Sequence, residues 1–165
     1  MAVTVDVTFE ERYWYPEDGG SVWLAGYNVV DSESGRYLGR DDPELAARGW
    51  RIAGVAGAAA HHAEILASDD VGPGRPLELR RDPDNPHDPN AIAVHVAGGR
   101  GQAGWVPREL AAELAGDLDA GRPWAAVVLR EQRPSPRGPR SGLTMLLAPT
   151  KAIALRFHAR RPPAR

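Results

Sequence analysis

Apolar and polar residues alternate at the start of the chain, where every second residue from Val3 to Phe9 is hydrophobic. A period of two is typical of a strand with one buried face, so a first strand is expected here. Residues 21–30 include Val, Trp and Tyr and predict a second strand. The following run 31–35 has the composition of a turn, so residues 36–38 are expected to fold back as a hairpin partner.

Two segments carry the signals of helices. Over 42–49, Asp42 is placed to cap the first turn, a proline follows it, and a glycine closes the segment. The second helix is expected to have Pro107 at its first position and to end before Gly121. Its leucines recur at every fourth position, at 110, 114 and 118. This spacing gives one apolar stripe, so we expect the helix to pack one face on a core.

The remaining regular segments are short and are separated by glycine and proline. Strands are expected over 50–57, 77–81, 91–96, 102–106, 124–130, 142–147 and 152–157. The alanine-rich segment 58–68 is permissive for helix. Many short strands with few helices predict a mainly β fold with short helices, built as a small barrel or curled sheet. Strands and helices do not alternate along the chain, which argues against a doubly wound parallel sheet.

The composition is that of a folded domain without covalent cross-links. A chain of 165 residues is long enough to bury a real core, and the 18 glycines and 15 prolines predict many turns. Because the sequence has no cysteine, it has no disulfide, no cysteine-based zinc site and no cysteine nucleophile. Its start lacks a basic and apolar leader, and no stretch approaches membrane-spanning length. We therefore expect a cytoplasmic protein with no membrane contact.

The small net charge of −2 hides a strong asymmetry along the chain. Residues 1–50 carry a net charge of −6 and residues 51–121 a net charge of −5, whereas residues 122–165 carry ten basic side chains against the single acid Glu131. All the basic residues except Lys151 are arginines, which bind phosphate in a bidentate fork. The basic segment is thus either a nucleic-acid contact or a solvated tail.

Several kinds of catalysis lack their motifs. The single lysine does not lie in a phosphate-cradling GxxxxGK[ST] loop, and no GxSxG elbow is present, so the chain is expected to be neither an ATPase nor a serine hydrolase. Oxygen and nitrogen ligands do cluster at 61–62, 69–70 and 87–88 as His-His, Asp-Asp and His-Asp pairs. Adjacent histidines on a helix point about 100° apart, so a surface or packing role is expected. Metal-dependent hydrolysis remains a third alternative, and no metal or cofactor is expected.

The segment 80–94, Arg-Arg-Asp-Pro-Asp-Asn-Pro-His-Asp-Pro-Asn-Ala-Ile-Ala-Val, is followed by Gly-Trp-Val-Pro-Arg-Glu-Leu-Ala at 104–111. Together they resemble the HIRAN domain family. The resemblance implies an OB-like β-barrel over 50–150, an N-terminal strand and helix extension over 1–49, and a basic C-terminal strand or tail over 151–165. Family members occur with helicase-like ATPases or alone, and the better understood ones bind single-stranded DNA at a free 3′ end.

The resemblance assigns three roles to the loop between the strands at 77–81 and 91–96. Asp88 matches the position whose carboxylate bonds a terminal 3′-hydroxyl, and a carboxylate would repel a 3′-phosphate. His87 matches a position that often stacks on the terminal base. Asn85 would shape the loop or contact the nucleotide. Without a ligand, Asp88 can instead hold the backbone amide of Asn90 in a turn.

Three further positions carry over from the family pattern. Arg108 matches a basic position in the first turn of the helix, where it would act with the backbone amides on a phosphate. Leu143 falls near an aromatic position, and Trp105 lies beside the glycine that ends a strand. The chain departs from the pattern at Ala56-Gly57-Ala58, where ligand-binding members have Arg-Tyr-Tyr. That change removes a stacking platform and is expected to weaken DNA binding.

The leading interpretation is a non-enzymatic module for single-stranded DNA 3′ ends in repair, replication or a mobile element, working with a helicase or nuclease partner. The second interpretation is a protein-interaction module with a degenerate DNA site. In that interpretation the aromatic residues of the N-terminal extension dock a partner, although such residues also serve as plain core. They are Tyr13, Trp14, Tyr15, Trp23 and Tyr27.

Overall fold

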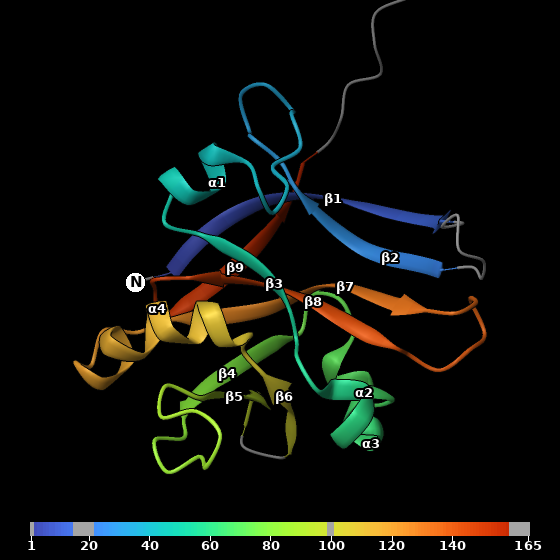
Figure 1. The fold of residues 1–165 in the computed structure, drawn as a ribbon. Helices are drawn as coiled ribbons and strands as arrows, with labels where there is room; N and C mark the ends of the chain where they lie inside the picture. Colours follow the sequence, from blue (N-terminus) through green and yellow to red (C-terminus); the bar gives the residue numbers. More distant parts are fainter. Residues whose placement is uncertain (1, 15–21, 99–100, 159–165) are drawn as a thin grey trace, which may run out of the picture.

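The computed structural model describes residues 2–14, 22–98 and 101–158 (Figure 1), and within them nine strands form one mixed sheet. The strands are β1 (Ala2–Trp14), β2 (Val22–Val29), β3 (Arg51–Gly54), β4 (Pro76–Arg81), β5 (Ile92–Val96), β6 (Gln102–Trp105), β7 (Ala125–Arg133), β8 (Gly142–Ala148) and β9 (Ala152–Phe157). Residues 36–38 form no strand, only a bridge between Tyr37 and Val30. The fold is mainly β with short helices, as predicted.

The helices are few and short. They are α1 (Pro43–Ala47), α2 (Ala58–His61), α3 (Ala63–Leu66), the 3-10 turn η1 (Asp69–Val71) and α4 (Arg108–Asp119). The helix-permissive segment 58–68 is broken at His62, whose φ of −135° is not helical. Pro107 is the N-cap of α4 with ψ of 141°, so it precedes the helix rather than opening it. None of the helices in the described ranges has the length and apolar character needed to cross a membrane.

Six strands form a ring around the first core. Ladders of paired residues join β3, β8, β7, β4, β5 and β6 in that order. Inside the ring, Val94, Val128 and Met145 are fully buried, and α4 adds Leu114. No ladder joins β6 back to β3 in the described chain, so of the two forms predicted, a small barrel or a curled sheet, the structure shows an open sheet and not a closed barrel. Only one bridge, between Ala56 and Trp105, spans that gap in the described part of the chain.

A second core lies where β1, β2 and β9 extend the same sheet. β2 pairs with both β1 and β7, and β9 runs parallel to β1. The side chains of Val5, Val7 and Val29 are buried together with Leu146 of β8. In Figure 1 the β1–β2 pair and α1 lie above the ring of strands. The predicted boundary at residue 49 falls between α1 and β3, and the domain division stays a prediction.

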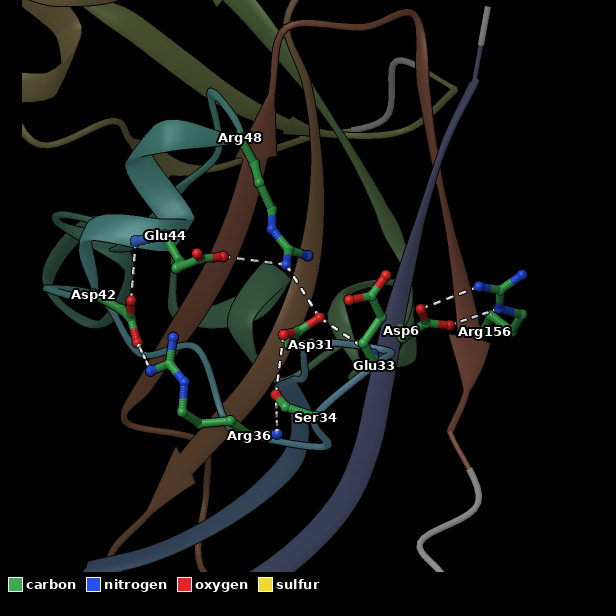
Figure 2. Close-up of polar contacts among 9 residues, drawn as sticks. All are labelled: Asp6, Asp31, Glu33, Ser34, Arg36, Asp42, Glu44, Arg48 and Arg156. Carbon is green, nitrogen blue, oxygen red and sulfur yellow. Dashed lines mark hydrogen bonds and ion pairs between the residues drawn. The ribbon is translucent and has the colours of Figure 1, made fainter.

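Short-range polar contacts hold α1 against the loop that follows β2 (Figure 2). The Oδ1 atom of Asp42 accepts the backbone amide of Glu44 at 3.0 Å, which is the helix cap that the sequence predicts. Arg48 at the end of α1 forms ion pairs with Glu44 and with Asp31, each at 3.4 Å. The basic group at the C-terminus of α1 thus fastens the helix to the start of the loop.

Candidate functional site

A pocket of about 300 Å³ opens between the end of β3, the β4–β5 loop, β6 and the start of α4. We call it the end pocket. It is lined by Ala56, Asn85, His87, Asp88, Ala91, Ile92, Trp105, Val106 and Arg108. The structure therefore brings together five of the six site residues predicted from the sequence, although they come from separate segments of the chain.

The β4–β5 loop is shaped by the side chain of Asn85. Its Oδ1 accepts the backbone amides of His87 at 2.9 Å and Asp88 at 3.3 Å, and its Nδ2 donates to Asp82 at 3.2 Å. An asparagine that bonds to amides two and three residues ahead fixes a turn without regular secondary structure. Asn85 therefore organises the loop, which is one of the two roles considered for it.

Asp88 has one oxygen in the turn and one directed elsewhere. Its Oδ1 accepts the backbone amide of Asn90 at 2.9 Å, so the turn-forming role is present. Its Oδ2 has no hydrogen-bond partner among the described residues, and the half-buried side chain lines the end pocket. One carboxylate can thus hold the loop and still offer an acceptor to a hydroxyl.

The opposite side of the pocket carries a cation at a helix start. Arg108 is the first residue of α4, is exposed, and forms no ion pair within the described ranges. Pro107, which precedes it, provides no side-chain cap, so the first amides of the 12-residue helix are left without a cap from this position. Free amides at a helix start and a nearby guanidinium both favour an anion.

Between Asp88 and Arg108, the pocket wall is formed where the backbones of Ala56 and Trp105 approach closely. Ala56 and Trp105 exchange two backbone hydrogen bonds, of 2.8 and 2.9 Å. A Cβ atom on Gly104 would lie 2.4 Å from the carbonyl oxygen of Ala56, so only glycine permits this approach. Trp105 follows it, half-buried, with its side chain in the pocket lining.

The departure from the family's Arg-Tyr-Tyr run lies at the same wall. Gly57 adopts a left-handed conformation with φ of 72°, which a side chain disfavours. Ala58 is 3% exposed and belongs to the core. Ala56 is exposed and is the only one of the three that lines the pocket. A larger side chain is therefore tolerated at only one of these positions.

The remaining candidates lie elsewhere. Leu143, the sixth predicted residue, is 4% exposed and packed in the first core, away from the pocket lining. His61 ends α2 and His62 follows it, with ring centroids 6.4 Å apart. Among the described residues no three His, Asp or Glu side chains are close enough to hold a metal ion.

Most of the described basic side chains of segment 122–165 have partners within the fold. Its partnered arginines are Arg122 with Asp117, Arg133 and Arg140 with Glu131, Arg156 with Asp6, and Arg130 with the carbonyl of Tyr27. Arg137 and Lys151 are exposed, and the arginines at 160, 161 and 165 lie outside the described residues. Most of the positive charge within the described part of this segment therefore stabilises the structure.

The aromatic residues proposed as a docking surface are divided. Tyr13 is 48% exposed, Tyr27 packs partly against the second core, and Trp23 is half-buried with the Arg133 guanidinium 5.8 Å from its ring. The side chain of Trp14 and residue Tyr15 lie outside the described part of the structure. The set is thus neither a single exposed surface nor plain core.

Sequence reasoning missed the apolar floor of the pocket. Ala91, Ile92 and Val106 line it beside the polar residues. Their strands were predicted, but their pattern is that of ordinary core, so the sequence held no signal that a cavity opens above them. The sequence held one signal that Ala56 could belong to a site, because the family carries an arginine at this position.

The comparison with known families decides what this pocket belongs to. A family model for the HIRAN domain matches residues 53–135, a range that contains every residue lining the end pocket. The chain belongs to the HIRAN domain family. HIRAN domains are DNA-binding modules. The HIRAN chain is also similar to the crystal structure of the HIRAN domain of human HLTF, with 28% identity, coverage of 59% of this chain and 74% of that chain, and a TM-score of 0.43. No curated protein matches it.

Proposed function

We propose that this HIRAN protein binds single-stranded DNA at a free 3′-hydroxyl end and that the end pocket receives the terminal nucleotide. The supporting observation is the convergence of Asp88 and Arg108 on one pocket from separate segments of the chain. Asp88 offers to the hydroxyl an oxygen that has no partner among the described residues, and Arg108 with the first amides of α4 holds a backbone phosphate.

The apolar floor and His87 complete the proposed site. Ile92, Val106 and Trp105 give a hydrophobic surface for sugar and base, while the exposed imidazole of His87 stacks on the terminal base. Because His87 presents a smaller ring than a tyrosine and Ala56 presents none, binding is expected to be modest. The module itself performs no chemistry in this proposal, and a helicase or nuclease partner would act on the bound end.

The direct test compares ends that differ only at the 3′ position. Fluorescence anisotropy at low salt with matched oligonucleotides is expected to show tighter binding to a 3′-hydroxyl than to a 3′-phosphate. Two charges about 4 Å apart repel by about 1 kcal/mol in water and about 4 kcal/mol near a protein surface, which predicts a preference of about fivefold or more. Equal affinity for the two ends, or no binding at low salt, would sink the proposal.

A further inference from the structure

A second cavity, of about 480 Å³, lies between the β1–β2 pair and the β7–β8 pair. We call it the Arg130 groove. It is lined by Glu10, Arg12, Val22, Leu24, Asn28, Tyr37, Leu38, Gly39, Arg130, Gln132 and Thr144. None of these residues lines the end pocket, and all but Arg130, Gln132 and Thr144 precede the matched HIRAN range.

The groove is built around a glycine. Glu10, Gly26, Arg130 and Thr144 form one row of cross-strand partners on four adjacent strands. A Cβ atom on Gly26 would lie 2.1 Å from the Leu129 carbonyl oxygen and 2.6 Å from the Arg130 Cα, so β2 can approach its partner β7 this closely only without a side chain. The pairing of β7 with β8 also shifts between Val128 and Arg130, and such a bulge re-aims the side chain that follows it.

The cation that this geometry positions has only neutral partners in the described chain. Nη1 of Arg130 donates to the carbonyl of Tyr27 at 3.0 Å and to Oδ1 of Asn28 at 3.4 Å. The carboxylate that lines the groove, Glu10, accepts from Nδ2 of Asn28 at 2.8 Å and forms no ion pair with Arg130. Burial, followed by the positive charges of Arg12 and Arg40, lowers the pKa of Arg130. A largely buried cation without a counter-charge is costly unless an anion joins it.

Two further arginines, Arg12 and Arg40, lie at or next to the groove. Arg12 lines it, and Arg40 follows the lining residue Gly39. Both are exposed and form no ion pair with any residue in the described ranges. Among the lining residues, Arg12 and Arg130 stand against the single carboxylate of Glu10, a net charge of +1, and the positive charge of Arg40 also acts on Arg130. A phosphate group matches this charge and the forked donors of arginine.

The groove and the end pocket are joined along the strands. Thr144 at the groove pairs with Gly54, and Ala56, two residues further on the same side of the chain, lines the end pocket. Ala56 and Arg130 are separated by two residues along a strand and by two strand spacings at right angles to it, which places them about 12 Å apart. A stacked strand rises about 3.4 Å per nucleotide, so about four nucleotides span this distance.

We propose that the Arg130 groove binds backbone phosphates of the same single strand whose 3′ end enters the end pocket, about four nucleotides toward the 5′ side. This proposal rests on the proposed function. It extends the DNA-binding surface beyond the matched HIRAN range to β1 and to the loop after β2.

The test varies the length of the strand and the charge of the groove. Anisotropy is measured with 3′-hydroxyl oligonucleotides of about three and about ten nucleotides, of which only the longer lies within the range of about 4–16 nucleotides that single OB folds cover. The variant Arg12→Gln/Arg40→Gln is expected to weaken binding of the longer strand by about two- to fivefold per arginine, as for other exposed ion pairs. Its salt dependence should fall by about 0.7 in log–log slope for each phosphate that the variant no longer neutralises. Binding of the short strand should not change.

The matched control is Lys151→Gln, which removes an exposed charge from the turn between β8 and β9, outside both cavities. An equal loss for both lengths, or no loss at all, would overturn the groove while leaving the 3′-hydroxyl preference intact. If the wild type shows no such preference but the double variant still loses the longer strand selectively, the groove is supported and the end pocket falls. The two proposals can therefore fail separately.

Discussion

Asp88 accepts the backbone amide of Asn90 through Oδ1, while its Oδ2, with no partner among the described residues, belongs to the lining of the end pocket. One carboxylate thus combines a structural and a binding role that substitutions can separate. Alanine removes both oxygens. Asparagine keeps an acceptor for the turn and replaces the other oxygen with a donor.

For Asp88→Asn, we expect unchanged thermal stability and retained binding of a 3′-hydroxyl, but loss of the discrimination against a 3′-phosphate. For Asp88→Ala, we expect loss of discrimination together with about 0.5–1.5 kcal/mol of stability, because the turn loses its hydrogen bond. Anisotropy and thermal melts measure the two effects. Asp84→Asn is the control, since Asp84 is an exposed carboxylate of the same loop that does not line the pocket. If Asp88→Asn keeps the wild-type preference for a 3′-hydroxyl over a 3′-phosphate, the Oδ2 atom of Asp88 does not recognise the 3′ end.

Ala56→Tyr is expected to tighten DNA binding. The exposed position lines the end pocket, and a base stacked on an aromatic side chain gains about 1–3 kcal/mol, or about five- to 150-fold in affinity. Titration by anisotropy measures the gain. Ala59→Tyr adds the same ring on the exposed side of α2, outside the pocket, and should leave affinity unchanged. Equal gains from both variants would indicate nonspecific stacking.

Gly26→Ala is expected to destabilise the fold by about 1–3 kcal/mol or more, because the added methyl overlaps the Leu129 carbonyl oxygen and the backbone has φ of 145°. Urea unfolding measures the loss. Gly116→Ala is the control, since a Cβ there meets no atom within 4 Å and the residue lies inside α4. That variant should gain about 0.4–1 kcal/mol. A Gly26→Ala variant with unchanged stability would contradict the close pairing of β2 with β7.

We expect the loss of folding stability at acid pH to depend on Glu131. This 6% exposed carboxylate pairs with Arg133 at 2.7 Å and with Arg140 at 2.6 Å. Burial would raise the pKa of Glu131, but the hydrogen bonds from these two arginines outweigh it and hold the pKa below 4.5. The unfolded carboxyl then binds a proton more readily than the folded one. Its contribution is complete above pH 4.5 and is lost as pH falls through the lower folded pKa.

Glu131→Gln should therefore cost about 3–5 kcal/mol in urea unfolding at neutral pH, since Arg140 is left buried without its counter-charge. The difference from the wild type should shrink as pH falls below 4.5. Glu78→Gln breaks the exposed pair with Arg80 and should cost less than about 1 kcal/mol. A constant difference across pH would show that Glu131 does not carry the proton linkage.

Local patterns predicted the elements, and a resemblance predicted much of the pocket. The alternation from Val3 to Phe9 and the caps at Asp42 and Gly49 correspond to β1 and α1, because those signals lie within a few residues. The second core and the Arg130 groove depend instead on β2 pairing with both β1 and β7, a register set by contacts distant in sequence. No local pattern records such a contact.

The same distinction explains the charge pattern. The segment after residue 121 has a basic composition, but Glu131 lies between Arg133 and Arg140 in space, and Arg156 reaches back to Asp6. Counting charges along the sequence could not show that these partners meet. The same count could not show that Arg130 has no acidic partner among the described residues and that its side chain lines a groove. The position of this side chain depends on a bulge in β7 and a glycine in β2, which are distant in sequence.

The bridge between Ala56 and Trp105 forms one wall of the end pocket. It is also the weakest junction between neighbouring strands in the ring. Every other junction in that ring joins at least two consecutive residue pairs, whereas this one depends, within the described chain, on two backbone hydrogen bonds. Opening it would separate β3 from β6 while the other ladders of the ring stay paired. The amide protons of Ala56 and Trp105 should therefore exchange with solvent faster than those of the neighbouring strands, and a nucleotide held against both residues should slow that exchange.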